Sequence, residues 1–192
     1  DTELTIYPRL KGKLVLITGA SAGIGKSSAY HFAACGSNLI LAARRIERLE
    51  EIKTDIEQKY GVQVTIAPLD IMDVKACETF YENLPVEQRE NVDILINNAG
   101  LAKTPALTYE VNWDEMNTMI DTNVKGVIKM LKMFVPGMVK RNAGHIITVG
   151  SIAGKDSYAK GGIYCGTKHF IEAINTSLRH ELIATPIRVS LI

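Results

Sequence analysis

The 192-residue sequence lacks a large excess of charge, a cysteine-rich pattern and any long hydrophobic run. Lysine and arginine number 22 and aspartate and glutamate 21, which gives a formal net charge of +1. A chain this close to neutral has no bulk field that would draw it to nucleic acid or to an anionic membrane. No apolar run reaches the roughly 18 residues that a membrane-spanning helix requires. We therefore expect neither nucleic acid nor a membrane as a partner.

Cysteines are few and scattered, at Cys35, Cys77 and Cys165, and none forms a CxxC pair or a cluster with histidine. A disulfide framework and a zinc site are therefore not indicated. This usage is typical of a reducing compartment. We expect a cytoplasmic protein without a bound metal.

Short apolar runs alternate with longer amphipathic stretches along the whole chain. Strands are predicted at 13–18, 38–43, 62–69, 92–97, 145–149 and 187–192, and helices at 24–34, 46–60, 74–84, 114–141 and 161–184. Wholly apolar runs such as KLVLIT indicate strands that are buried on both faces. The alternation predicts an α/β fold, a Rossmann-like doubly wound parallel sheet with helices on both faces.

The length predicts a single domain over residues 1–192. Residues 1–11 are expected to form a partly extended lead-in, and Pro136 to kink or change the backbone near the end of the long 114–141 helix. The apolar strand at 187–192 would leave an edge able to pair with further chain, so we expect the native chain to continue beyond it.

A glycine-rich turn, TGASAGIG, joins the first predicted strand to the first helix. Gly19 permits the tight turn, Gly23 lets the backbone approach a pyrophosphate, and Gly25 lets the helix pack closely on the sheet. The free N–H groups at the helix N-terminus would face the anion. Dinucleotide contacts are expected from Gly19, Ser21, Gly23, Ile24 and Gly25.

Two other interpretations of this turn remain open. It is also compatible with an ordinary strand–helix turn rich in small residues. The stretch ASAGIGKS is one residue short of the phosphate-binding loop GxxxxGK[ST], with Ala20 where the first glycine belongs. Asp70, after the third strand, would then serve as the magnesium-binding carboxylate of a nucleotide hydrolase.

The end of the second strand bears on the choice of dinucleotide. An acidic residue there selects NAD by accepting a hydrogen bond from the ribose 2′-hydroxyl. This chain instead has Arg44 and Arg45 at the start of the next helix, where the helix dipole disfavours cations. A 2′-phosphate would explain them, so NADP is the predicted cofactor. The alternative is a solvated pair, with Arg45 bonded to Glu47.

Tyr164 and Lys168 form a YxxxK pair on a predicted helix, where residues four apart share one face. A tyrosine hydroxyl has a reference pKa near 10, so proton exchange near neutral pH needs adjacent positive charge. YxxxK alone is a weak signal, because both residue types are common on helix surfaces.

The motifs around the YxxxK pair make a catalytic role for Tyr164 and Lys168 more specific. Ser151 follows the fifth strand, 13 residues before Tyr164; the sequence NNAG at 97–100 closes the fourth strand; and Asn123 lies in the long helix. With TGxxxGxG and YxxxK, these motifs in this order resemble the short-chain dehydrogenase/reductase family, over residues from about 13 to 192.

The resemblance implies a role for each matching residue. Tyr164 would be the general acid/base, Lys168 would lower the tyrosine pKa and bind the nicotinamide ribose, and Ser151 would donate a hydrogen bond to the substrate oxygen. Asn123 would hold a water that relays protons through Lys168. Further NADP contacts are implied for Asp70 beside the adenine ring and for Asn97, Ala99 and Gly100.

Within the family, the stretches GASAGIGK, LAARRIERL and GSIAG…YCGTK are most similar to the NADP-dependent 3-hydroxy acid dehydrogenases, which implies serine or a related short 3-hydroxy acid as substrate. Lys155 and Tyr158 are candidates for placing its carboxylate, or belong to a solvated loop. The alternatives are a broad ketone or aldehyde reductase and a non-catalytic NADP-binding sensor.

The resemblance also bears on assembly and on the length of the domain. It implies a homodimer or homotetramer, packed through the helices at 114–141 and 161–184. The family continues after the sixth strand with a Pro-Gly turn, a substrate lid and a seventh strand, which this sequence does not contain.

Overall fold

The computed structural model describes residues 7–192. Of the expected extended lead-in, residues 1–6 lie outside the described part. The remainder is partly extended, as predicted: Tyr7 and Lys11 have extended backbone, and between them Pro8–Leu10 forms a 3-10 turn, η1, with a proline at its start. The fixed φ of proline suits the first turn of a helix, which the prediction overlooked.

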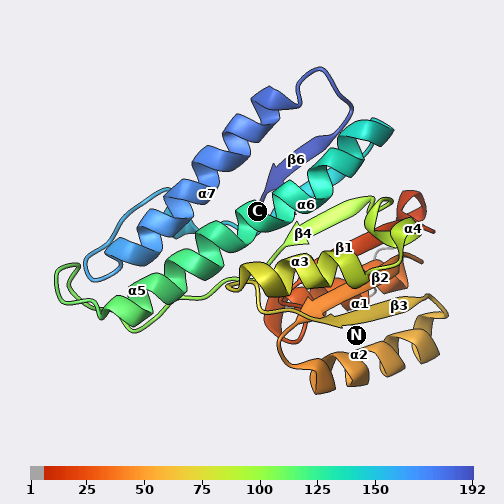
Figure 1. The fold of residues 1–192 in the computed structure, drawn as a ribbon, viewed down its shortest axis with the longest axis horizontal. Coiled ribbons are helices and arrows are strands. Elements are labelled where there is room, and N and C mark those ends of the chain that lie inside the picture. Colours follow the sequence, from red (N-terminus) through yellow and green to blue (C-terminus); the bar gives the residue numbers. More distant parts are fainter. Residues whose placement is uncertain (1–6) are drawn as a thin grey trace.

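Six parallel strands form one sheet in the order β3-β2-β1-β4-β5-β6 (Figure 1). Their bounds are β1 Leu14–Thr18, β2 Asn38–Ala43, β3 Val64–Pro68, β4 Ile94–Asn97, β5 His145–Thr148 and β6 Arg188–Leu191. The predicted doubly wound parallel sheet is confirmed, and each predicted strand overlaps an observed one.

Helices cover both faces of this sheet (Figure 1). On one face lie α1 (Gly23–Ala34) and α2 (Ile46–Tyr60), and on the other α3 (Val74–Asn83), α6 (Gly126–Arg141) and α7 (Gly162–Glu181). The shorter elements are α4 (Val86–Arg89), α5 (Trp113–Ile120), η2 (Asp121–Lys125) and η3 (Ile152–Gly154).

Each helix layer packs on its own hydrophobic core. Residues alternate between the two cores along β1, β2 and β4: Val15 and Ile17 of β1 pack toward α1 and α2, whereas Leu16 packs toward α3, α6 and α7. All three of these side chains are fully buried. A strand buried on both faces must be apolar throughout, which is why these strands were recognisable in the sequence.

The predicted helix at 114–141 is interrupted, although not at Pro136. The π-helical turn η2 separates α5 from α6, and α6 runs through Pro136. Single π-turns within α-helices are frequent at functional sites. Here the wider turn contains Asn123, which is 2% exposed.

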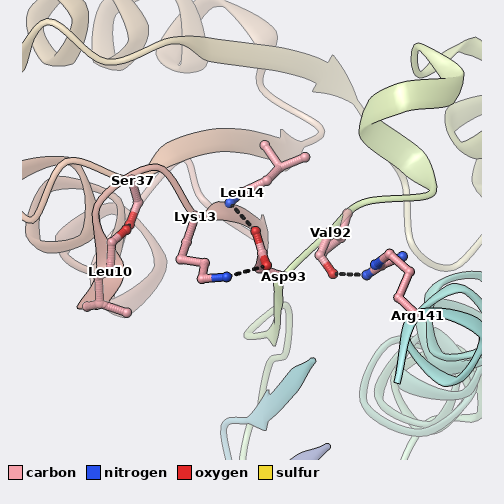
Figure 2. Close-up of polar contacts among 7 residues, drawn as sticks. All are labelled: Leu10, Lys13, Leu14, Ser37, Val92, Asp93 and Arg141. Atoms are coloured by element: carbon pink, nitrogen blue, oxygen red, sulfur yellow. Dashed lines mark hydrogen bonds and ion pairs between the residues drawn. The ribbon is translucent and has the colours of Figure 1, made fainter. Parts of the chain in front are cut away.

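Polar contacts connect neighbouring elements at the amino ends of the strands (Figure 2). Asp93, just before β4, accepts hydrogen bonds from the backbone N–H of Leu14 and from Lys13 Nζ, both at 2.9 Å. Arg141, at the end of α6, donates to the Val92 carbonyl at 2.8 Å. These contacts tie β1, β4 and α6 together at the amino ends of the two strands.

The chain leaves β1 toward β2 and β3 and returns to the other side of β1 through β4. In open parallel sheets, ligands bind beyond the carboxyl ends of the strands at such a switch point. The ends of β1 and β4 are therefore the expected place for a functional site. Within the described residues, no helix is long and apolar enough to cross a membrane.

Candidate active site

A cleft of about 510 Å³ lies at the carboxyl ends of β1 and β4. The residues with predicted cofactor contacts that line it are Gly19, Ser21, Gly23, Ile24, Arg44, Arg45, Asp70, Ala99, Gly100, Tyr164 and Lys168. Gly25, Asn97, Asn123 and Ser151 are not among its lining residues. Segments from both halves of the sheet thus meet at one opening.

The three glycines of the first turn have different surroundings. Gly19 and Gly23 have φ angles of +67° and +54°, which favour glycine. A Cβ on Gly23 would meet nothing within 4 Å, so the backbone there faces open space in the cleft. A Cβ on Gly25 would lie 2.6 Å from the Gly19 carbonyl oxygen, so Gly25 allows close packing and does not face the cleft.

The start of α1 suits an anion. Its first N–H groups have no partner within the helix, and the N-cap residue Ala22 provides no side-chain hydrogen bond. Ile24 lines the cleft and is 59% exposed. In the phosphate-binding loop of a nucleotide hydrolase, the lysine at the position of Lys26 would point at the phosphates. Here Lys26 does not line the cleft, and its ammonium lies 6.0 Å from the centre of the Tyr30 ring. The nucleotide-hydrolase interpretation therefore fails.

Arg44 and Arg45 are exposed at the cleft, at the start of α2. Arg45 donates to Ser21 Oγ at 2.9 Å, which ties the second strand's end to the glycine turn. Among the described ion pairs there is none between Arg45 and Glu47. Both guanidinium groups are thus available to an anion beside the glycine turn.

Thr18 and Asn98 join the ends of β1 and β4; the sequence allowed Asn98 to satisfy backbone groups at a strand end, but the part of Thr18 was not predicted. Thr18 Oγ1 accepts from the backbone N–H groups of Asn98 and Ala99, both at 3.1 Å. The Asn98 amide donates to the carbonyls of Thr18 at 2.9 Å and Gly19 at 3.3 Å. A polar residue ending an apolar strand, as Thr18 does, was the available signal.

Asn97 lies away from the cleft. It is the last residue of β4, is 3% exposed, and neither polar atom of its side chain has a hydrogen-bond partner in the described structure. Its backbone carbonyl accepts from the Val149 N–H at 3.0 Å. The predicted NADP contact from Asn97 therefore has no support in the geometry, whereas its neighbour Asn98 lines the cleft.

Tyr164 and Lys168 meet on the first turns of α7. The Lys168 ammonium lies 5.9 Å from the centre of the Tyr164 ring and donates to the Val149 carbonyl at 2.9 Å. Lys168 is 8% exposed, and this burial lowers the pKa of its ammonium from the usual value. A charge with so little water around it exerts a weakly screened field on its neighbours.

Ser151 caps the short turn η3 that follows β5. Its Oγ accepts from the Ala153 N–H at 3.1 Å. A Cβ on Gly154 would lie 2.9 Å from the Lys168 carbonyl oxygen, so η3 packs tightly against α7. A serine hydroxyl has a single proton, and this contact uses only an acceptor position, so the proton remains available to a ligand.

Asn123, in η2, holds the loop that follows β4. Its Oδ1 accepts from the Leu101 N–H at 2.9 Å, and its Nδ2 donates to the Leu101 carbonyl at 2.8 Å and to Thr167 Oγ1 at 3.1 Å. Both N–H groups of the amide are therefore occupied. A water bound to this side chain would have to donate to Oδ1.

The two candidates for a substrate carboxylate lie in the loop after η3. Lys155 forms an ion pair with Glu172 of α7 at 2.5 Å. Tyr158 is 52% exposed and lies over Gly161, where a Cβ would overlap its ring. Lys155 is thus neutralised by a protein carboxylate, which leaves it poorly suited to bind another.

The comparisons with known proteins agree with this geometry. Residues 13–192 match the short chain dehydrogenase family. The chain is 46% identical over 182 residues to the NADP-dependent 3-hydroxy acid dehydrogenase of Schizosaccharomyces pombe, covering 94% of this chain and 70% of that protein.

Two solved structures are also similar. Serine dehydrogenase from Escherichia coli superposes with a TM-score of 0.86 at 42% identity, over 93% of this chain and 80% of that one. The closed form of a serine dehydrogenase complexed with NADP+ gives a TM-score of 0.85 at 41% identity, over 93% and 70% of the two chains. On this evidence the chain belongs to the short-chain dehydrogenase family.

Proposed function

We propose that this protein is an NADP(H)-dependent oxidoreductase that transfers a hydride between nicotinamide and a short hydroxy compound or its carbonyl product, with a 3-hydroxy acid such as serine as substrate. The observation that carries the proposal is the cleft itself. Arg44 and Arg45 line the same opening as Tyr164 and Lys168. The relatives at 41–46% identity are dehydrogenases of 3-hydroxy acids or serine.

The residues present fit a dinucleotide. Gly23 offers backbone with open space beside it, and the start of α1 directs unpaired N–H groups at an anion. Arg44 and Arg45 provide two exposed guanidiniums near that helix, which suits the 2′-phosphate of NADP. Asp70 lines the cleft on the loop after β3, where the adenine ring is expected.

When bound, the cofactor supplies or accepts the hydride. The Tyr164 hydroxyl would give a proton to the substrate oxygen during reduction and take it back during oxidation. The Lys168 ammonium, held by the Val149 carbonyl, stabilises the phenolate that remains. The Ser151 hydroxyl, whose proton is available, would donate to the same substrate oxygen. Asn123 would fix the Leu101 loop and accept a hydrogen bond from a relay water at Oδ1.

The substrate is tested by comparing serine, allo-threonine and 3-hydroxypropionate with neutral alcohols of equal length, primary for the first and third and secondary for allo-threonine, with NADP+ as oxidant. We expect kcat/KM for the best 3-hydroxy acid to exceed that of the matched neutral alcohol by at least about tenfold, since one well-placed charge contact is worth about 1.4 kcal/mol or more. Equal or better turnover of neutral substrates would favour the broad reductase. Cofactor binding without turnover of any substrate would favour the sensor.

We also propose that two copies associate through the groove between α6 and α7. This groove of about 660 Å³ is lined mainly by apolar side chains, including Leu131, Val135 and Ile174, with Lys132 and Glu181 also present. Across a two-fold axis the same patch faces itself, so Lys132 and Lys140 of one copy would lie near Glu181 of the other and pair with it.

Light scattering should give twice or four times the mass of one chain, and Ile174→Glu should shift the protein to a monomer because a carboxylate would be buried in the interface. A wild-type monomer, or an unchanged mass in the variant, would contradict this assembly.

We further propose that the chain forms a single domain and works in the cytoplasm. The single six-stranded sheet with its two helix layers supports one domain. The free thiols of Cys77 and Cys165 are consistent with a reducing compartment. Limited proteolysis that released two stable fragments would contradict the first proposal, and fractionation of the native cells tests the second.

A further inference from the structure

The loop after β3 forms one wall of the cleft through four consecutive residues, 69–72. It is held at its start, where the Leu69 N–H donates to the Ala43 carbonyl at 3.0 Å. It is also held internally, since Asp70 Oδ1 accepts from the Met72 N–H at 3.0 Å. Neither contact involves the backbone carbonyls of Ile71 and Met72.

Lys129 of α6 holds the Ile71 and Met72 carbonyls, and the Cys77 thiol of α3 adds a longer contact of 3.7 Å to the Ile71 carbonyl. Lys129 Nζ donates to the Ile71 carbonyl at 2.9 Å and to the Met72 carbonyl at 2.7 Å. None of the ion pairs in residues 7–192 involves Lys129, so the two carbonyls are the partners of its ammonium. Hydrogen bonds from a charged donor are roughly twice as strong as neutral ones.

The same helix also receives the loop's side chain. A Cβ on Gly126 would lie 2.9 Å from Ile71 Cγ1, so the Ile71 side chain packs directly on the helix backbone. Six residues before Lys129, Asn123 holds the Leu101 backbone, which lines the cleft on the loop after β4. One continuous helical segment therefore holds two separate walls of the cleft.

We infer that Lys129 is a positioning residue that presents the 69–72 loop, with Asp70, to the adenosine half of NADP. The inference rests on the proposed function for the identity of the ligand. Lys129 does not line the cleft itself. Its effect would pass through the backbone carbonyls that it holds, and would fall on the adenosine half and not on the nicotinamide half.

The test uses Lys129→Met, which keeps the side-chain length and removes the donors, with Lys129→Arg to restore them. Lys125→Met is the matched control, because Lys125 lies one turn earlier, is 64% exposed and pairs only with Asp121 in the described ion pairs. The probes are NADPH, 2′,5′-ADP as the adenosine half, and nicotinamide mononucleotide. Hydrogen exchange at the Met72 and Asp73 amides reports on the loop without any ligand.

We expect Lys129→Met to weaken NADPH and 2′,5′-ADP binding by about tenfold each, to raise KM for NADPH, and to leave kcat at saturating NADPH within about twofold. Exchange at Met72 and Asp73 should quicken, and Lys129→Arg should recover most of the loss. Binding of nicotinamide mononucleotide should not change.

Unchanged 2′,5′-ADP binding in Lys129→Met, an equal loss in Lys125→Met, or a loss confined to kcat would overturn the inference. Failure of the proposed function would give a different result, because the wild-type protein would then bind neither NADPH nor 2′,5′-ADP. In that case the inference about the ligand would also be wrong, even if the exchange rates at Met72 and Asp73 changed as expected.

Discussion

Tyr164→Phe is expected to lower kcat/KM by about 10³-fold, within the 10²–10⁴-fold range typical of a general acid/base. The ring stays, so its packing against the Lys168 ammonium 5.9 Å away is retained while the exchangeable proton is lost. NADPH affinity should change by less than about twofold. Steady-state kinetics and a cofactor titration on the same preparation measure both effects.

Tyr60→Phe is the matched control for this variant. Tyr60 ends α2, and its ring packs beside Lys59, so it too has an aromatic ring near an ammonium. It does not line the cleft, and its variant should keep wild-type kcat/KM. Turnover by Tyr164→Phe within a few-fold of the wild type would remove the basis of the proposed mechanism.

Replacing both Arg44 and Arg45 with alanine is expected to reduce the preference for NADPH over NADH by about 100-fold. Each guanidinium–phosphate hydrogen bond is charge-assisted and contributes about 1.5 kcal/mol or more, and NADH has no 2′-phosphate to lose. Loss of the bond from Arg45 to Ser21 should affect both cofactors alike. Dissociation constants for the two cofactors, measured by fluorescence, give the ratio.

Arg48→Ala controls for the loss of positive charge, because Arg48 is exposed on α2, which follows the two arginines, and does not line the cleft. This variant should retain the wild-type ratio. If the double variant weakened NADPH and NADH equally, the arginines would not recognise the 2′-phosphate.

The strands could be predicted because burial on both faces leaves no choice but apolar residues, as in β1 and β2. Predictions failed where local geometry outweighs periodicity. The four-residue helix α4 is too short to show a period, and η1 depends on one proline. The π-turn η2 lies inside the stretch 114–141 that was predicted as one helix, so the change in hydrogen bonding within 121–125 was not predicted from the sequence.

The motifs identified many residues that line the cleft, and also Asn123 and Ser151, which do not line it, but they did not predict which groups each side chain contacts. Asn97 and Asn98 are adjacent and chemically identical, and only the end of β4 decides that the first is buried in the sheet and the second reaches β1. Asn123 and Lys129 contact backbone groups 22 and 57–58 residues away. Contacts between residues so far apart in the sequence form only in the folded protein, and the spacing of residues within a motif does not predict them.

Titration of the wild-type protein with NADPH and with NADH, following cofactor fluorescence, tests the central claim most directly. The arrangement of the glycine turn, Arg44 and Arg45 around one cleft predicts saturable NADPH binding with a dissociation constant at least about tenfold below that for NADH. Binding of neither cofactor, or equal binding of both, would contradict the assignment of this cleft to NADP.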